Sequence, residues 1–190
     1  MSFHVYVKRV PYAVVGDIEA GRADPETYVL DGEPYSMGGP APARSVGLIG
    51  VWETLLYVLS DEYRRRLPHV DPFVRVVFED PLARAVVGAR HVAHLLEDGG
   101  SGERRFRVNT PAEVAGVARA LGAADFDRSV TEARAFADRE GGRYDPVYTP
   151  GPFRGRRPLD VGAYRSLFEA LVGLYDEAAA CGEASTHYKG

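Results

Sequence analysis

The pattern closest to a metal site in this chain is His91-x-x-His94-x-x-Glu97. Residues three apart share one face of a helix, and two imidazoles with a carboxylate form a ligand set that suits zinc. The His-Glu-x-x-His motif of zinc hydrolases is absent, and Gly88 and Gly99 bound the stretch too closely for a long helix. Two exposed or capping histidines are the alternative to a metal-dependent hydrolase. We predict no bound metal and no other cofactor.

Three arginines, Arg154, Arg156 and Arg157, lie in a Gly- and Pro-rich segment directly before a predicted helix start. Guanidinium groups bind phosphates and carboxylates through paired N–H donors, and a helix N-terminus also favours an anion. The glycine spacings of nucleotide-binding loops are absent. The segment therefore indicates an anion-binding or partner-binding site, with a solvated loop as the alternative.

The chain offers little for nucleophilic catalysis. Its one cysteine, Cys181, follows three alanines at a predicted helix end, where the negative end of the helix dipole disfavours a thiolate. The Gly-x-Ser-x-Gly motif of serine hydrolases is also absent. A single cysteine excludes a disulfide within the chain and favours a reducing compartment, so we expect a cytoplasmic protein.

Composition narrows the class of protein. The 190 residues are 45% apolar and 26% charged, which fits one well-packed domain over residues 1–190. The net charge of −4 is unlike that of a general nucleic-acid binder, so no nucleic-acid partner is expected. The segment Met1 to Lys8 does not resemble a secretory signal, and no apolar run approaches the roughly 18 residues of a membrane span.

Three segments are predicted strands: His4–Val10, Arg104–Val108 and Glu183–Lys189. Helical spacing of leucine, valine and tryptophan predicts a buried helix over Ser45–Ser60, followed by a charged exit over Asp61–Arg66. Further helices are predicted by their capping residues, which are Pro11, Asp80 with Pro81, Thr110 with Glu113, Asp125 and Asp160. Segments 31–44 and 143–158 are rich in Pro and Gly and are predicted loops.

The order of these elements predicts the fold class. Strands occur near both ends and in the middle of the chain, without regular β-α-β alternation. This order favours an α+β fold over a doubly wound sheet. We therefore expect a single compact domain in which several helices pack on a small antiparallel or mixed sheet.

Five segments carry motifs that recur together, in this order, in one family. They are Trp52–Ser60, Asp80-Pro-Leu-Ala-Arg-Ala-Val-Val-Gly88, Phe106-Arg-Val-Asn-Thr-Pro-Ala-Glu-Val114, Tyr144–Pro150 and Ala178–Gly182. The chain resembles the YfbM-like bacterial proteins over roughly residues 48–190. Relative to that pattern, Asp61 to Glu79 looks like an insertion. The resemblance implies a cytoplasmic α+β protein of a family without an established reaction, so it assigns no catalytic residues.

Polar and aromatic residues on the matched motifs form a candidate pocket. The group is Trp52, Tyr57, Asp80, Arg84, Tyr144, Asp145 and Tyr148. Packing in the core, with satisfied polar tips, is the alternative for each of them, and Asp80 has a structural role as a helix cap.

Two functions follow from these observations. The favoured hypothesis is a non-enzymatic binding or regulatory protein, of immunity or antitoxin type, that acts through a protein partner. The alternative is a small-ligand-binding protein or enzyme that uses the pocket group. The two differ in whether Trp52, Asp80, Arg84, Tyr144 and Asp145 converge on a concave pocket.

Overall fold

The computed structural model describes residues 4–23, 44–66, 77–92, 106–139 and 160–189. Within them, five strands form one sheet in the order β2-β1-β5-β4-β3, and each pair of neighbours is antiparallel. The strands are β1 (His4–Val10), β2 (Ser45–Ile49), β3 (Arg90–His91), β4 (Phe106–Asn109) and β5 (Ala184–Lys189). The predicted α+β fold with an antiparallel sheet is confirmed.

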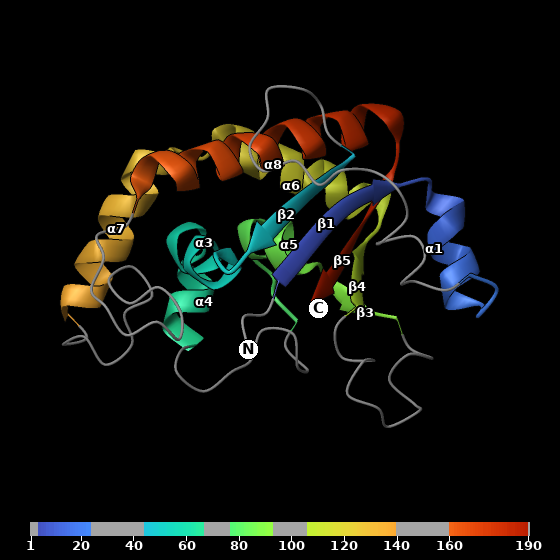
Figure 1. The fold of residues 1–190 in the computed structure, drawn as a ribbon, viewed down its shortest axis with the longest axis horizontal. Coiled ribbons are helices and arrows are strands. Elements are labelled where there is room, and N and C mark those ends of the chain that lie inside the picture. The colour runs from blue at the N-terminus through green and yellow to red at the C-terminus, as the bar shows by residue number, and fades with distance from the viewer. Residues whose placement is uncertain (1–3, 24–43, 67–76, 93–105, 140–159, 190) are drawn as a thin grey trace.

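Seven helices lie in the described part of the chain (Figure 1). They are α1 (Tyr12–Glu19), α3 (Trp52–Leu59), α4 (Asp61–Arg66), α5 (Pro81–Val87), α6 (Pro111–Ala123), α7 (Phe126–Arg139) and α8 (Val161–Cys181). Helix α8 runs along the sheet, while α7 and α1 lie at opposite ends of the molecule. None of the helices in the described ranges is long and apolar enough to cross a membrane.

The sheet has an apolar cluster on each face. In β1, Val5 and Val7 belong to the larger cluster, which includes the buried faces of α3, α5, α6, α7 and α8. Val10 belongs to a smaller cluster with Val15 and Ile18 of α1. Since successive side chains of a strand point to opposite faces, α1 packs on the face opposite to the other helices.

The helix caps agree with the sequence. The Asp80 carboxylate accepts a hydrogen bond from the backbone N–H of Leu82 at 2.9 Å, with Pro81 in the first helical position. Thr110 and Glu113 form a complete capping box at the start of α6. Asp125 and Asp160 cap α7 and α8 in the same way. These devices act within four residues, which is why sequence alone predicts them.

The prediction of one helix over Ser45–Ser60 is wrong. Residues Ser45–Ile49 form β2, and Gly50, at φ 68°, separates this strand from α3. Val46 and Leu48 pair with Val7 and Val5 of β1. Leu48 also has helical spacing to Val51, Trp52 and Leu55, whereas Val46 and Leu48 alternate as in a strand, and pairing with β1 decides between the two patterns.

Three further differences are local. Asp61–Arg66, interpreted as a charged exit, is a helix of its own, and Arg90–His91 form a short strand that is not predicted from the sequence. Of the strand predicted at Arg104–Val108, residues 104 and 105 lie outside the described residues, and the described part, β4, ends one residue later, at Asn109. The predicted loops at 31–44 and 143–158 lie almost wholly outside the described residues.

Candidate functional site

Helix α4 owes its position to two buried side chains at its centre. Tyr63 is 1% exposed and packs edge-on against Phe78, with ring centroids 6.2 Å apart. The Arg64 guanidinium is also buried, and it donates hydrogen bonds to the carbonyl oxygens of Tyr57 at 2.8 Å and Val58 at 2.9 Å. It thereby satisfies carbonyl groups at the C-terminal end of α3. The remaining four charged side chains of α4 are left for the surface.

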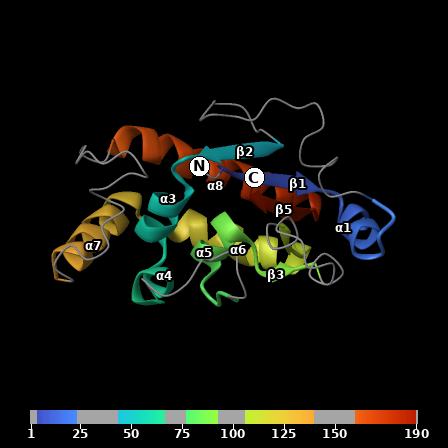
Figure 2. The same ribbon diagram turned by 60° about the horizontal axis from the view of Figure 1, so that its bottom comes forward.

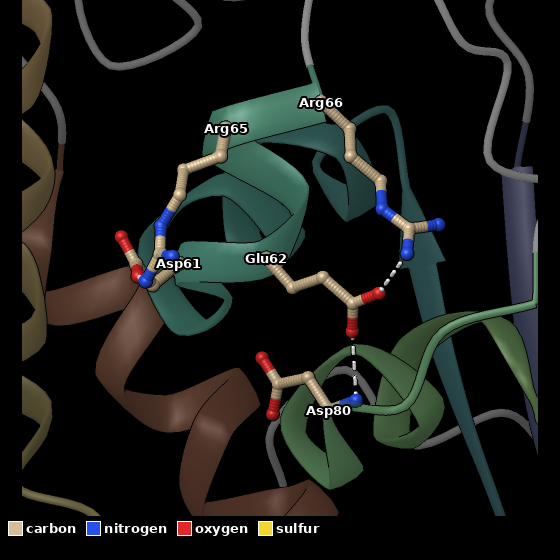
Figure 3. Close-up of a pocket in the computed structure, with 5 residues that line it drawn as sticks. All are labelled: Asp61, Glu62, Arg65, Arg66 and Asp80. Atoms are coloured by element: carbon tan, nitrogen blue, oxygen red, sulfur yellow. Dashed lines mark hydrogen bonds and ion pairs between the residues drawn. The ribbon is translucent and has the colours of Figure 1, made fainter.

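These four side chains and Asp80 line an open hollow of about 420 Å³ between α4 and the start of α5 (Figure 3). Figure 2 shows the two helices side by side. Asp61 pairs with Arg65, and Glu62 pairs with Arg66 at 2.6 Å, each four residues apart along α4. Such spacing brings the partners together on one helix face.

The carboxylates of the hollow are held in place. Glu62 accepts hydrogen bonds from the backbone N–H groups of Glu79 at 2.9 Å and Asp80 at 2.7 Å. The second oxygen of Asp80 accepts a bond from the Ser60 hydroxyl at 2.6 Å. These contacts join α4 to the chain entering α5, so the hollow has a fixed wall.

Arg66 is fixed as well. Its guanidinium contacts Glu62, donates to the carbonyl oxygen of Val77 at 3.3 Å, and lies 5.6 Å from the ring centroid of Phe78. Arg65 is 72% exposed in its side chain. Val77, whose carbonyl oxygen accepts from Arg66, is 52% exposed. The surface therefore combines immobilised charges with one apolar contact point.

A second group of chemically capable residues lies inside the molecule. Arg107 and Asn109 of β4 stand opposite His187 and Ser185 of β5, and Tyr175 of α8 covers them. The Ser185 hydroxyl is 3.0 Å from Nε2 of His187, as in a serine–histidine pair. We call these five residues the buried polar row.

The row fixes the protonation of His187. Its Nδ1 lies 3.1 Å from the carbonyl oxygen of Val86. Because a carbonyl oxygen only accepts hydrogen bonds, Nδ1 carries the proton and Nε2 carries a lone pair. Complete burial lowers the pKa of His187 to about 3, and nearby Arg107 acts in the same direction. Burial likewise raises the pKa of Tyr175.

The hydrogen-bonding side chains of the row contact the backbone of α5 and not solvent. Asn109, Ser185 and His187 are all 0% exposed. Asn109 donates to the carbonyl oxygen of Arg84 at 3.1 Å, Tyr175 donates to that of Ala85 at 3.2 Å, and His187 donates to that of Val86 at 3.1 Å. Three successive carbonyls at the end of α5 are thus satisfied by side chains from elsewhere, so the row docks α5 on the sheet.

The described members of the predicted pocket group contact different neighbours. Trp52 lies beside Lys189, whose ammonium is 5.2 Å from the ring centroid, whereas Tyr57 packs edge-on against Phe136 of α7. Asp80 lines the hollow. Arg84 points elsewhere, donating to the carbonyl oxygen of Phe78 at 2.5 Å and pairing with Glu79 at 3.1 Å.

Of the other predicted site residues, only His91 lies within the described residues. Eight of them lie outside the described residues: Tyr144, Asp145, Tyr148, Arg154, Arg156, Arg157, His94 and Glu97. His91 lies on β3, where burial and, less strongly, Arg107 lower its pKa to about 4. In the described ranges, no three His, Cys, Asp or Glu residues lie close enough to hold a metal ion.

The hollow itself was not anticipated from the sequence. Acidic residues in the first turn of α4 and basic residues in its last turn are the signal that favours a short helix there. No sequence signal links Glu62 to the backbone at Asp80, 18 residues away.

Comparison with known proteins supports the fold alone. No protein-family model matches the chain, and no curated protein is significantly similar to it in sequence. Among solved structures, it is similar to a protein of unknown function, YfbM from Escherichia coli, with a TM-score of 0.59 and 18% sequence identity over 100% of both chains. The resemblance seen in the sequence motifs is therefore confirmed at the level of the fold.

Proposed function

We propose that this protein is a non-enzymatic binding protein whose protein partner docks on the hollow between α4 and α5. The docking surface consists of Asp61, Glu62, Arg65, Arg66, Val77 and Asp80, and is called the α4–α5 surface below. The observation that carries the proposal is the fixed arrangement of charged side chains around an open hollow, together with the exposed Val77, whose carbonyl oxygen accepts from Arg66. A regulatory role of immunity or antitoxin type is one form of such binding.

The immobilisation of Arg66 and Glu62 favours this function. Binding orders side chains at an interface, and groups that are already held lose little further freedom. Arginine is enriched among the residues that dominate binding energy, and opposite charges at fixed positions select a partner by electrostatic complementarity. A hollow of about 420 Å³ is large enough to receive a side chain of the partner.

The position of the surface in the chain points the same way. Four of its six residues lie on α4, and Val77 precedes α5, so five fall within the segment Asp61 to Glu79. The sequence motifs indicate that this segment is an insertion. An insertion that adds charges to a shared fold suits a partner specific to this protein.

Photocrosslinking tests the proposal. A photoreactive phenylalanine analogue at Val77 should capture a partner from lysate of the source cells, and the same analogue at Thr131, exposed on α7, provides the control. The captured protein, once purified, should bind the wild-type chain and bind the Arg65→Glu variant at least about fivefold more weakly. Equal capture at both positions, or equal affinity of the two proteins, would count against the proposal.

One observation favours the alternative of a small ligand. Asp80 belongs to the pocket group predicted from the sequence and also lines the hollow. A ligand that binds only the folded protein stabilises it and so raises its melting temperature. At a ligand concentration a hundred times the dissociation constant, the free energy of unfolding rises by about 2.7 kcal/mol. A saturable thermal shift with a metabolite, abolished by Asp80→Asn, would favour this alternative over a protein partner.

A further inference from the structure

We infer that the α4–α5 surface receives an acidic side chain of its partner, with an apolar residue beside it that covers Val77. This inference rests on the proposed function and names the chemistry of the partner. It follows from a comparison of two sets of groups in the five charged residues of the hollow: the donors and acceptors that already make hydrogen bonds, and those that do not.

The carboxylates are already engaged in contacts within this protein. Both oxygens of Glu62 and both of Asp80 accept hydrogen bonds from α4, from Ser60 or from the backbone leading into α5. One oxygen of Asp61 is paired with Arg65, and the other lies 3.6 Å from Arg64. An incoming ammonium group would compete with these contacts, several of which hold the hollow together.

The guanidinium groups, in contrast, keep most of their donors. Each arginine has five N–H groups in a planar fork. Arg65 uses one nitrogen toward Asp61, and Arg66 uses two, toward Glu62 and the carbonyl oxygen of Val77. The remaining donors face solvent and can bind an acceptor of the partner, and a carboxylate matches a planar fork better than any other side chain.

The neighbouring surface determines what accompanies the carboxylate. Val77 is 52% exposed, and its carbonyl oxygen is the one that holds Arg66. A partner group bound at Arg66 therefore has an apolar residue of this protein next to it. Burial of Val77 by a leucine or isoleucine of the partner removes apolar surface from water and shields the ion pair from screening.

The charge balance of the hollow gives the inference a direction that can be measured. Among the residues that line the hollow, Asp61, Glu62 and Asp80 outnumber Arg65 and Arg66 by one, and the buried Arg64, 3.6 Å from Asp61, offsets this difference. The negative charge of Asp80 opposes an incoming carboxylate. Asp80→Asn removes that charge and keeps a side-chain oxygen for the cap of α5. This variant should bind an acidic probe more tightly than the wild type, and a basic probe more weakly.

The experiment uses a defined probe and arginine side-chain NMR of the full chain. The probe is the peptide acetyl-Ala-Leu-Glu-Leu-Ala-amide, and the Gln and Lys versions of it are the comparisons. The Glu peptide should shift the Nε–Hε signals of Arg65 and Arg66 saturably, and Arg65→Gln should weaken its binding at least about fivefold. Arg128→Gln is the matched control, since Arg128 is 77% exposed and pairs with Glu132 four residues away.

The possible outcomes separate this inference from the proposed function. The inference is overturned if the Gln or Lys peptide binds as tightly as the Glu peptide or more tightly. It is also overturned if inorganic phosphate binds more tightly than the Glu peptide, because the arginine donors would then be assigned to a phosphate group. If crosslinking at Val77 captures a partner whose affinity is lost in Asp61→Lys and unchanged in Arg65→Gln, docking stands and the acidic anchor is wrong. If no partner is captured, the proposed function fails, whatever the peptides do.

Discussion

Acidification below about pH 6.5 is expected to destabilise this protein, because His187 is neutral in the folded state. The ring is completely buried, its Nδ1 donates to the carbonyl oxygen of Val86, and its Nε2 faces Asn109, Ser185 and Tyr175. Arg107 on the neighbouring strand also opposes a positive charge on the imidazole. Burial lowers the pKa of His187 to about 3, against about 6.5 in the unfolded chain.

The sign and size of the effect follow from proton linkage. Below pH 6.5 the unfolded chain binds a proton that the folded protein refuses, so the free energy of unfolding falls as the pH falls toward 3. With these pKa values, lowering the pH from 8 to 5 removes about 2 kcal/mol through His187 alone. His91, whose pKa is lowered to about 4, acts in the same direction.

Urea unfolding at pH 8 and pH 5 measures this loss, with the fluorescence of Trp52, the one tryptophan of the chain, as the signal. The variant His187→Gln removes the titrating group. Its stability at pH 8 should be lower than that of the wild type, because the contacts of the row are altered. The decisive quantity is the difference in stability between the two pH values, which should shrink by about 2 kcal/mol in the variant.

The reasoning is refuted if His187→Gln retains the full pH dependence of the wild type. If the variant does not fold at pH 8, the wild type provides the test. The carbon and nitrogen NMR shifts of the His187 ring should stay those of the Nδ1–H tautomer from pH 8 down to pH 5, and a midpoint above about 5 would contradict the buried neutral state.

Three further predictions concern the same core. Gly88→Ala should lower the free energy of unfolding, measured in urea, by about 2–3 kcal/mol, because Gly88 is at φ 76° and a Cβ there would lie 2.9 Å from His187. Its control is Gly16→Ala on α1, where a Cβ meets open space and the change should be neutral or stabilising. Tyr175→Phe should lower the melting temperature through a loss of about 1–3 kcal/mol, since it removes the hydroxyl that donates to the buried carbonyl oxygen of Ala85. Thr110→Ala should cost about 1 kcal/mol by removing the cap of α6, measured in the same way.

The parts of this fold that sequence predicts are those decided by neighbours in the chain. Asp80, Thr110 and Asp160 cap helices through backbone groups two or three residues away. Those contacts depend on local geometry and recur wherever the residue types recur. The inward face of α8 follows from helical periodicity in the same way.

The parts that sequence does not predict depend on contacts between distant segments. Ser45–Ile49 becomes a strand because β1 lies beside it. Asn109 and His187, 78 residues apart, form the buried polar row only after β4 and β5 have paired. The hollow requires Glu62 to reach the backbone at Asp80. In each case the residue types suit several environments, and packing selects one.

Helix α5 links the buried polar row to the α4–α5 surface. Its last turn is held by Asn109, Tyr175 and His187, and the residue that caps its first turn, Asp80, forms a wall of the hollow. The helix is only seven residues long, too short to be stable by itself, so its position depends on these contacts at both ends. His187 therefore helps to hold α5 on the sheet, and changes in the row should reach the hollow through the position of Asp80.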